Sequence, residues 1–210
     1  MGHHASPDFA TALAALDAGL LDPPSASPGD LNVVLDRLLV WLRRLLGADA
    51  GSMYLRHGDM LRLVLVQNDT LGSRLGPAEL RLRLQGLTVP LSPGSVAGYV
   101  ALTGDVVNVA DVADVPVDVP WALCSALDRG LYTFRSVLAV PVELVSGEIL
   151  GVLQLFNACD ADRRPAAFPP GVEAVVFRFA VRAARIITRY RAEGLSLGLS
   201  VNGTQISGQG

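Results

Sequence analysis

The chain has 210 residues, half of them hydrophobic and 18% charged, which is enough apolar material for a sizeable core and excludes wholesale disorder. A net charge of −3 gives no general attraction to nucleic acid or to an anionic membrane surface. No segment reaches the roughly 18 uninterrupted apolar residues of a membrane helix, and the first Lys or Arg is Arg37, so a basic signal-peptide region is missing. We therefore expect a cytoplasmic protein with no nucleic-acid and no membrane partner.

Changes in composition divide the chain into three parts. Residues 1–29 are rich in Ala, Ser, Pro and Asp and predict a flexible N-terminal arm, whose adjacent His3 and His4 have no further ligand nearby to make a metal site. Residues 30–192 predict one folded domain. Residues 193–210 are dominated by Gly, Ser, Asn and Gln and predict a disordered C-terminal tail.

The first half of the domain combines helical and strand-like patterns. Asp30 caps a helix at Leu31–Leu46, whose leucines recur at spacings of four and three before Gly47. A turn at residues 57–59 separates two β-rich runs, which predicts a hairpin. The further elements expected are strands at 52–55, 61–67, 82–91 and 106–109, a short helix at 94–103 and a loop at 111–129.

The second half contains two apolar strands, 136–144 and 149–156, joined by a turn at residues 146–148. A long helix from Val172 to Tyr190 follows, with apolar residues at alternating spacings of four and three. This order predicts an α+β fold, with an antiparallel sheet of five or six strands. Because both long helices carry apolar seams, we expect them to pack together on one face of the sheet.

The span from Leu31 to Tyr190, about three-quarters of the chain, resembles a GAF domain. The resemblance rests on segments in family order: 48–55, 61–71, 93–104, 107–112, 132–141 and the closing hairpin with its Gly-Val-Leu-Gln-Leu strand. It implies a GAF/PAS-like sheet and a small-molecule-sensing or regulatory signalling module without catalytic activity and without a cofactor. The sequences of these segments resemble GAF modules attached to bacterial cyclic-dinucleotide phosphodiesterases.

GAF domains that bind cyclic nucleotides have a signature of Asn-Lys, a spacer, Phe, three residues and Asp-Glu. Asn157, Phe168 and Glu173 match it, whereas Ala158 and Val172 replace the Lys and the Asp. The loop at 105–128 contains five aspartates and no Arg, and the chain contains no Lys to meet a phosphate. We therefore expect no tight binding of cAMP or cGMP.

The resemblance places a ligand pocket between the sheet and residues 106–131. By family position, the residues expected near this pocket are Ser95, Val96, Asn108, Asp111, Trp121, Arg135 and Ser136. The competing hypothesis is a ligand-free dimerisation or interaction scaffold, which the loss of the charged signature pair favours.

The two long helices also predict a homodimer through Leu31–Leu46 and the helix from Val172 to Tyr190. Beside their main stripes, the first helix adds Val34 and Trp41 and the last adds Val175 and Ile187, so each apolar surface is wider than sheet packing requires. In this family, paired helices usually pass a signal to a neighbouring module, which makes a signalling protein a further expected partner.

Two other features bear on function. Some stand-alone GAF proteins resemble free methionine sulfoxide reductases, but Cys124 and Cys159 are isolated and predict incidental thiols, so an enzyme based on Cys124 is the third hypothesis. A basic stripe on the last helix predicts a solvated flank, with nucleic acid or an acidic partner as the alternative. The stripe consists of Arg178, Arg182, Arg185 and Arg189.

Overall fold

A computed structural model describes residues 14, 31–122, 132–160, 162–169, 171–192 and 200–201 of the chain. The rest of the predicted N-terminal arm and Cys124 lie outside the described residues. None of the helices in the described part is long and apolar enough to cross a membrane.

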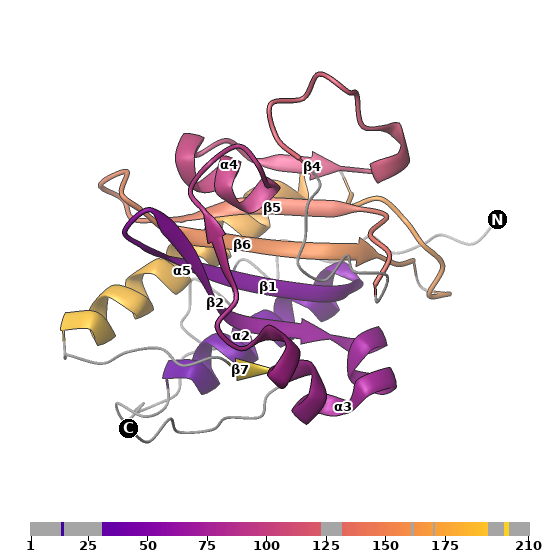
Figure 1. Cartoon of the computed structure of the whole chain (residues 1–210), viewed down its shortest axis with the longest axis horizontal. Coiled ribbons are helices and arrows are strands. Elements are labelled where there is room, and N and C mark those ends of the chain that lie inside the picture. The colour runs from indigo at the N-terminus through magenta and orange to yellow at the C-terminus, as the bar shows by residue number, and fades with distance from the viewer. Residues whose placement is uncertain are drawn as a thin grey trace.

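Six strands form an antiparallel sheet in the order β3-β2-β1-β6-β5-β4, which confirms the α+β prediction (Figure 1). The strands are β1 Ala48–His57, β2 Met60–Asn68, β3 Thr88–Pro90, β4 Val107–Val109, β5 Val137–Glu143 and β6 Ile149–Ala158. The helices are α2 Leu31–Leu46, α3 Asp69–Leu84, α4 Val96–Thr103 and α5 Val172–Ala192, with a short 3₁₀ helix η2 at Val112–Asp114.

One face of the sheet, called the helix face below, is covered by α2 and α5 together, as the sequence predicts (Figure 1). Leu35, Leu42 and Ile187 are fully buried between these helices and the central strands. Trp41 of α2 stacks on Phe179 of α5 with ring centroids 5.2 Å apart, so the two helices also contact each other directly.

The extra apolar residues that motivated a homodimer are largely used inside the protomer. Val34 and Ile187 are buried in the helix-face core, Trp41 is half-buried against it, and Val175 is also buried. The apolar surface of each helix is wide because each helix packs against two neighbours, the sheet and the other helix. These side chains therefore do not require a second copy to leave water.

The opposite face, called the α4 face below, is covered by α3, α4 and residues 107–122, called the covering segment. Its core includes Leu71 and Leu80 of α3 and Val100 of α4, all buried against the strands. Gly104 ends α4 in the left-handed conformation, with φ 79°, as its place after the helical run predicts.

The prediction of a strand at 82–91 is wrong for its first part, because α3 continues to Leu84 and only Thr88–Pro90 is a strand. Alternating Leu and Arg from Leu80 to Leu84 imitates a strand pattern. On a helix, however, Leu80 and Leu84 lie four residues apart on one buried face, whereas Leu82 is 70% exposed. The Leu-Arg pattern thus fits both the two-residue period of a strand and the four-residue spacing of a helix face.

The C-terminal segment contributes a further, very short strand. Ser200–Val201 forms β7, which pairs in parallel with Leu65 and Val66 of β2, and Val201 is buried. β7 therefore lies on the same edge of β2 as β3 and adds one apolar residue to the α4-face core.

Candidate functional site

Three residues predicted near the pocket meet at the start of α4. Ser95 is buried and caps α4, since its hydroxyl accepts a hydrogen bond from the Gly98 backbone N–H at 3.0 Å. The Val96 N–H donates to the carbonyl of Ala122 at 3.1 Å, which holds the end of the covering segment, and Trp121 packs half-buried on the α4-face core. The hydroxyl of Ser95 is therefore already engaged by the helix terminus.

A second group gathers where β5 begins and β6 ends. Asn157 adopts the left-handed conformation with φ 53°; its Oδ1 accepts from the Arg135 N–H at 2.7 Å and its Nδ2 donates to the Thr133 carbonyl at 2.8 Å. The buried hydroxyl of Ser136 accepts from the Ala158 N–H at 2.9 Å. The signature Asn therefore fixes the backbone that leads into β5.

The covering segment is attached to this second group. Asp111 caps η2 by accepting from the Ala113 N–H at 2.9 Å, and the next N–H, of Val112, donates to the Arg135 carbonyl at 2.7 Å. The side chains of Asp111 and Arg135 are both exposed. The group at the start of β5 thus holds the covering segment at Val112, and the group at the start of α4 holds it at its end, Ala122.

Asn108 lies on the other side of the sheet. Val107 and Val109 point into the α4-face core, and strand alternation places Asn108 between them on the helix face. There its Nδ2 donates to Glu173 Oε1, in the first turn of α5, at 2.5 Å. The structure therefore joins a residue predicted for the pocket to a residue of the signature and separates both from the α4 face.

The apolar replacements in the signature agree with their surroundings. Val172 is 0% exposed and Phe168 is 4% exposed, both within the helix-face core, and Ala158 is buried at the end of β6. A lone carboxylate at position 172 would be costly in such a site without its Lys partner. Loss of both charges thus leaves a closely packed core.

The wall of the α4 face next to the covering segment is aromatic. Phe134 lies between Tyr132 and Phe156, with ring centroids 5.2 and 4.9 Å away. The polar groups predicted nearby are hydrogen-bonded within the chain, so this wall offers a ligand flat apolar contact and few free donors.

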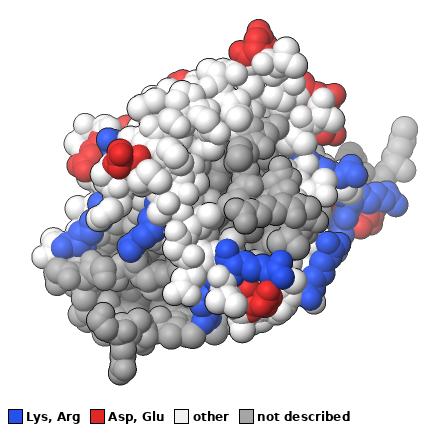
Figure 2. Space-filling view, in the orientation of Figure 1, with Lys and Arg blue, Asp and Glu red and all other residues white. Residues whose placement is uncertain are grey.

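The outside of the covering segment is acidic, as the sequence predicts. Asp111, Asp114 and Asp118 of this segment are exposed, as is Asp105 just before it, and red side chains gather at the top of Figure 2, over this part of the chain. The Tyr99 hydroxyl donates to Asp105 at 2.8 Å, and this hydrogen bond raises the pKa of Tyr99.

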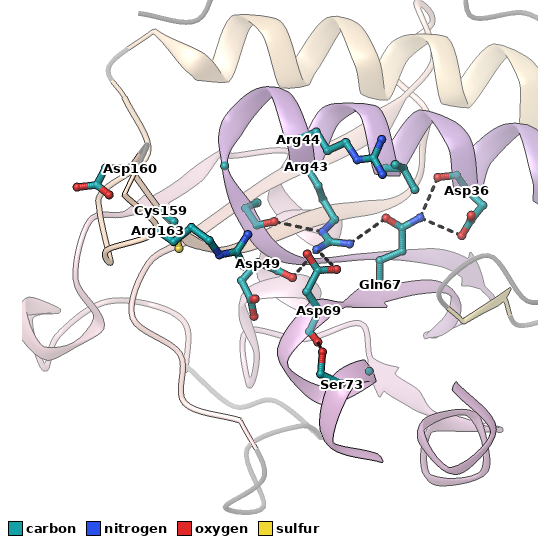
Figure 3. A pocket seen from close by; sticks show the side chains of 14 residues that line it. Asp36, Arg43, Arg44, Asp49, Gln67, Asp69, Ser73, Cys159, Asp160 and Arg163 are labelled. Atoms are coloured by element: carbon teal, nitrogen blue, oxygen red, sulfur yellow. Dashed lines mark hydrogen bonds and ion pairs between the residues drawn. The ribbon is translucent and has the colours of Figure 1, made fainter. Parts of the chain in front are cut away.

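A polar cavity of about 640 Å³ lies elsewhere, where the end of α2 meets the starts of β1 and α3 (Figure 3). Sequence reasoning did not identify it. Its central group is Arg43, a buried guanidinium that donates to Gln67 Oε1 at 3.2 Å and forms an ion pair with Asp69 at 2.9 Å. The same guanidinium donates to the carbonyls of Ala48 and Asp49, which fixes the junction of α2 and β1.

Asp49 connects this cavity to the α4 face. Its carboxylate accepts from the Thr70 hydroxyl at 3.0 Å and from the Tyr132 hydroxyl at 2.7 Å, and Tyr132 belongs to the aromatic wall. Burial, followed by the hydrogen bond with Asp49, raises the pKa of Tyr132. The sequence indicates this cavity in only one way: an Arg stands within a leucine-rich helix, and a polar run at 67–70 ends an apolar strand.

Cys159 lines the same cavity, with its thiol 3.6 Å from the Asn157 carbonyl. Burial raises the pKa of this thiol and the negative charge of Asp49 raises it further, so the reactive thiolate is disfavoured. Among the described residues, no cluster of His, Cys, Asp and Glu could hold a metal ion.

Comparisons with known proteins give a consistent picture. The model of the GAF domain family matches residues 30–187. The cGMP-specific 3′,5′-cyclic phosphodiesterase of Drosophila mojavensis is 30% identical over 161 residues, which are 73% of this chain and 14% of that enzyme. The same enzyme of Drosophila virilis is 29% identical over 131 residues, 61% of this chain and 14% of the enzyme. The chain thus spans a small fraction of the length of these relatives.

Solved structures share the fold. The GAF domain of a phosphoenolpyruvate-protein phosphotransferase from Coxiella burnetii superposes with a TM-score of 0.65 at 21% identity, covering 89% of this chain and 96% of that one. A free methionine-R-sulfoxide reductase from Neisseria meningitidis, solved with its substrate, superposes with a TM-score of 0.60 at 19% identity, covering 92% of this chain and 98% of that one. At these identities the likeness concerns the fold alone.

Proposed function

Because the chain belongs to the GAF domain family, we propose that it is a regulatory signalling module that senses a small molecule and has no catalytic activity of its own. The ligand would contact the α4 face under the covering segment, near Ser95, Val96, Trp121 and the aromatic wall. We further propose a cytoplasmic location, since two isolated cysteines fit a reducing compartment.

The observation that carries this proposal is the hydrogen bond between Asn108 and Glu173. The covering segment contacts the α4 face through Val96 and Arg135, and through Asn108 it also contacts the N-terminal turn of α5. A ligand that changes the packing of this segment would therefore change a contact with the helix pair. To do so, it must bind one arrangement of the segment better than the other.

The two tryptophans of the chain provide a direct test, because they lie on opposite faces. Trp121 reports on the covering segment and Trp41, stacked on Phe179, reports on the helix pair. The experiment screens small molecules by thermal shift and then measures the emission of each hit with Trp41→Phe and with Trp121→Phe. We expect a ligand to change both signals, and Asn108→Ala to retain the Trp121 response while losing most of the Trp41 response.

The matched control is Asn32→Ala, an amide substitution in α2 away from the covering segment, which should leave both responses intact. A ligand that changes Trp41 emission equally in Asn108→Ala would disprove the role of the hydrogen bond. A ligand that shifts the melting temperature without any Trp121 response would place binding outside the α4 face.

Cyclic nucleotides need a separate measurement, because the curated relatives are named as cGMP-specific enzymes. We propose that this chain binds neither cAMP nor cGMP tightly, since Ala158 and Val172 are buried apolar residues and the covering segment is acidic. Isothermal titration with both nucleotides tests this. A dissociation constant at or below about 1 μM would show that other groups replace the missing charges.

The second candidate function is a ligand-free scaffold that dimerises through α2 and α5. It is favoured by the internal hydrogen bonds of the predicted pocket residues and by Phe177, a large apolar side chain that remains exposed on α5. Sedimentation at micromolar concentration would decide it, because a clean monomer mass excludes the dimer.

A thiol-based methionine sulfoxide reductase is the third candidate, and the raised pKa of Cys159 argues against that thiol as its nucleophile. Reduction of free methionine-R-sulfoxide that is lost in Cys124→Ser and kept in Cys159→Ser would establish an enzyme in place of the sensor.

A further inference from the structure

A groove of about 450 Å³ runs along the outer side of α5, next to the tip of the β5–β6 hairpin. It belongs to the helix α5 on the helix face and shares no residue with the polar cavity. The groove is lined by Glu143, Leu144, Val145, Phe177, Arg178, Val181, Arg182 and Arg185.

The floor of the groove is apolar. Phe177 is 40% exposed and Val145 is 84% exposed, and Val181 follows Phe177 by one helical turn. These three side chains come from two elements, so they form one contiguous surface rather than scattered single residues. Apolar side chains gathered in a groove with a polar rim are the pattern of a contact site.

The edge of the groove is basic. Arg178, Arg182 and Arg185 recur at spacings of four and three along α5, and Glu143 is the one acidic residue that lines this groove. Seven residues of helix extend over about 10 Å, so the three arginines accompany the floor for two turns of α5. Guanidinium groups bind carboxylates in a paired geometry, which selects for acidic residues at matching positions.

We propose that this groove binds an acidic amphipathic helix of a partner protein, and that it is the output surface of the proposed sensor module. Apolar side chains of the partner at helical spacing would cover Phe177, Val181 and Val145, and carboxylates beside them would face the three arginines. A second copy of α5 would instead bring arginine stripes together, which like-charge repulsion disfavours. The inference rests on the proposed function for its biological meaning, but not for its chemistry.

The test uses the full chain and two synthetic peptides of about 20 residues, long enough for a helix spanning the groove. Both carry Leu at helical spacing; one carries Glu beside the Leu positions and the other carries Lys at the same positions. Fluorescence anisotropy of labelled peptide gives the affinities. We expect the Glu peptide to bind at least about tenfold more tightly than the Lys peptide and to weaken with added salt.

Variants locate the binding surface. Phe177→Ala and Arg185→Glu should each weaken binding of the Glu peptide roughly tenfold, because one removes the apolar floor and the other reverses a rim charge. The matched control is Arg74→Glu, an equal charge reversal at an exposed position of α3, which should change the affinity less than about twofold. Circular dichroism confirms that each variant is folded.

Three outcomes would overturn the proposal: equal affinity for the two peptides, affinity unchanged by both groove variants, or a dimer that Phe177→Ala dissociates and that excludes the peptide. A nucleic-acid oligomer that outcompetes the Glu peptide would equally reject it. The small-molecule response of Trp121 is measured separately, so failure of the groove leaves the sensor proposal standing, and failure of the sensor leaves the groove standing.

Discussion

The two faces of the sheet differ in how they are covered. On the helix face, two long helices cover the central strands with aliphatic side chains and contact each other through Trp41 and Phe179. On the α4 face, the kinked helix α3 and the short helix α4 also pack on buried side chains, but the covering segment is held by individual hydrogen bonds, and Trp121 and Phe134 remain half-buried. Segments with few buried contacts open at lower free energy than packed helices. The helix face therefore supplies more stability than the covering segment, and the covering segment can rearrange.

Substitution in the helix-face core tests this difference most strongly. Ile187→Ala removes a fully buried side chain between α5, α2 and the sheet, so we expect a loss of about 3–4 kcal/mol in the free energy of unfolding. Val115→Ala, at a half-buried position of the covering segment, should lose less than about 1 kcal/mol. Urea denaturation measures both, and equal losses would contradict the assignment of stability to the helix face.

Arg43 joins α2 of the helix face to Asp69 of α3, which covers the α4 face, so its removal should affect both faces. Arg43→Met leaves Gln67, Asp69 and two backbone carbonyls without their donor, so we expect a loss of about 3 kcal/mol. The carboxylate of Asp69 is largely exposed, so water compensates part of the loss of its ion pair with Arg43. Arg44→Met, at the exposed neighbouring position, is the control and should be nearly neutral in the same denaturation experiment.

High pH should loosen the α4 face first. Burial raises the pKa of Tyr54 to about 12, above its ordinary value of 10.0, so the folded state holds this proton more tightly than the unfolded chain does. The resulting stability is complete below pH 10 and is lost as the pH rises toward 12. Tyr132, whose pKa is also raised, adds to the same loss.

We expect Tyr54 alone to account for a fall of about 2 kcal/mol in the free energy of unfolding between pH 10 and 12, and Tyr54→Phe to remove that part of the fall. Trp121 emission should change before Trp41 emission in this range. A simultaneous change of both signals would mean that the two faces unfold as one unit.

The smallest effect concerns the junction at Asn157. Asn157→Ala removes the acceptor of the Arg135 N–H and the donor to the Thr133 carbonyl, and it leaves a residue with a Cβ at positive φ without local hydrogen bonds. We expect a loss of about 1–2 kcal/mol. Asn157→Gly, which tolerates the backbone conformation, should restore part of it; if it restores none, the side-chain bonds account for the whole effect.

The long elements could be predicted from the sequence because each has one unambiguous period. The α2 leucines and the closing hairpin belong to this group. The α3 helix was missed because Gly76, with φ 76°, and Pro77 interrupt it, and because its Leu-Arg alternation fits a strand as well. Its one local signal was Asn68, whose side chain caps the helix by accepting from the Leu71 N–H at 2.7 Å.

Predicted site residues were harder to place than elements. Strand alternation between Val107 and Val109 could have placed Asn108 on the helix face, but family position alone put it near the pocket. The Arg43 cavity depends on residues from α2, β2 and α3 that meet only after folding, so no spacing in the sequence reveals it. Charged residues inside apolar patterns were the sole indication.

The short strand β7 has a consequence for any shortened form of this protein. Beyond the pairing of β3 with residues 60–62, the outer edge of β2 is covered at Leu65 and Val66 by Ser200–Val201. A chain cut after Ala192, where the last helix ends, would leave these apolar residues with unpaired backbone groups on an open strand edge. Open edges recruit strands from other molecules, so we expect such a chain to aggregate more readily than the full chain, as light scattering would show.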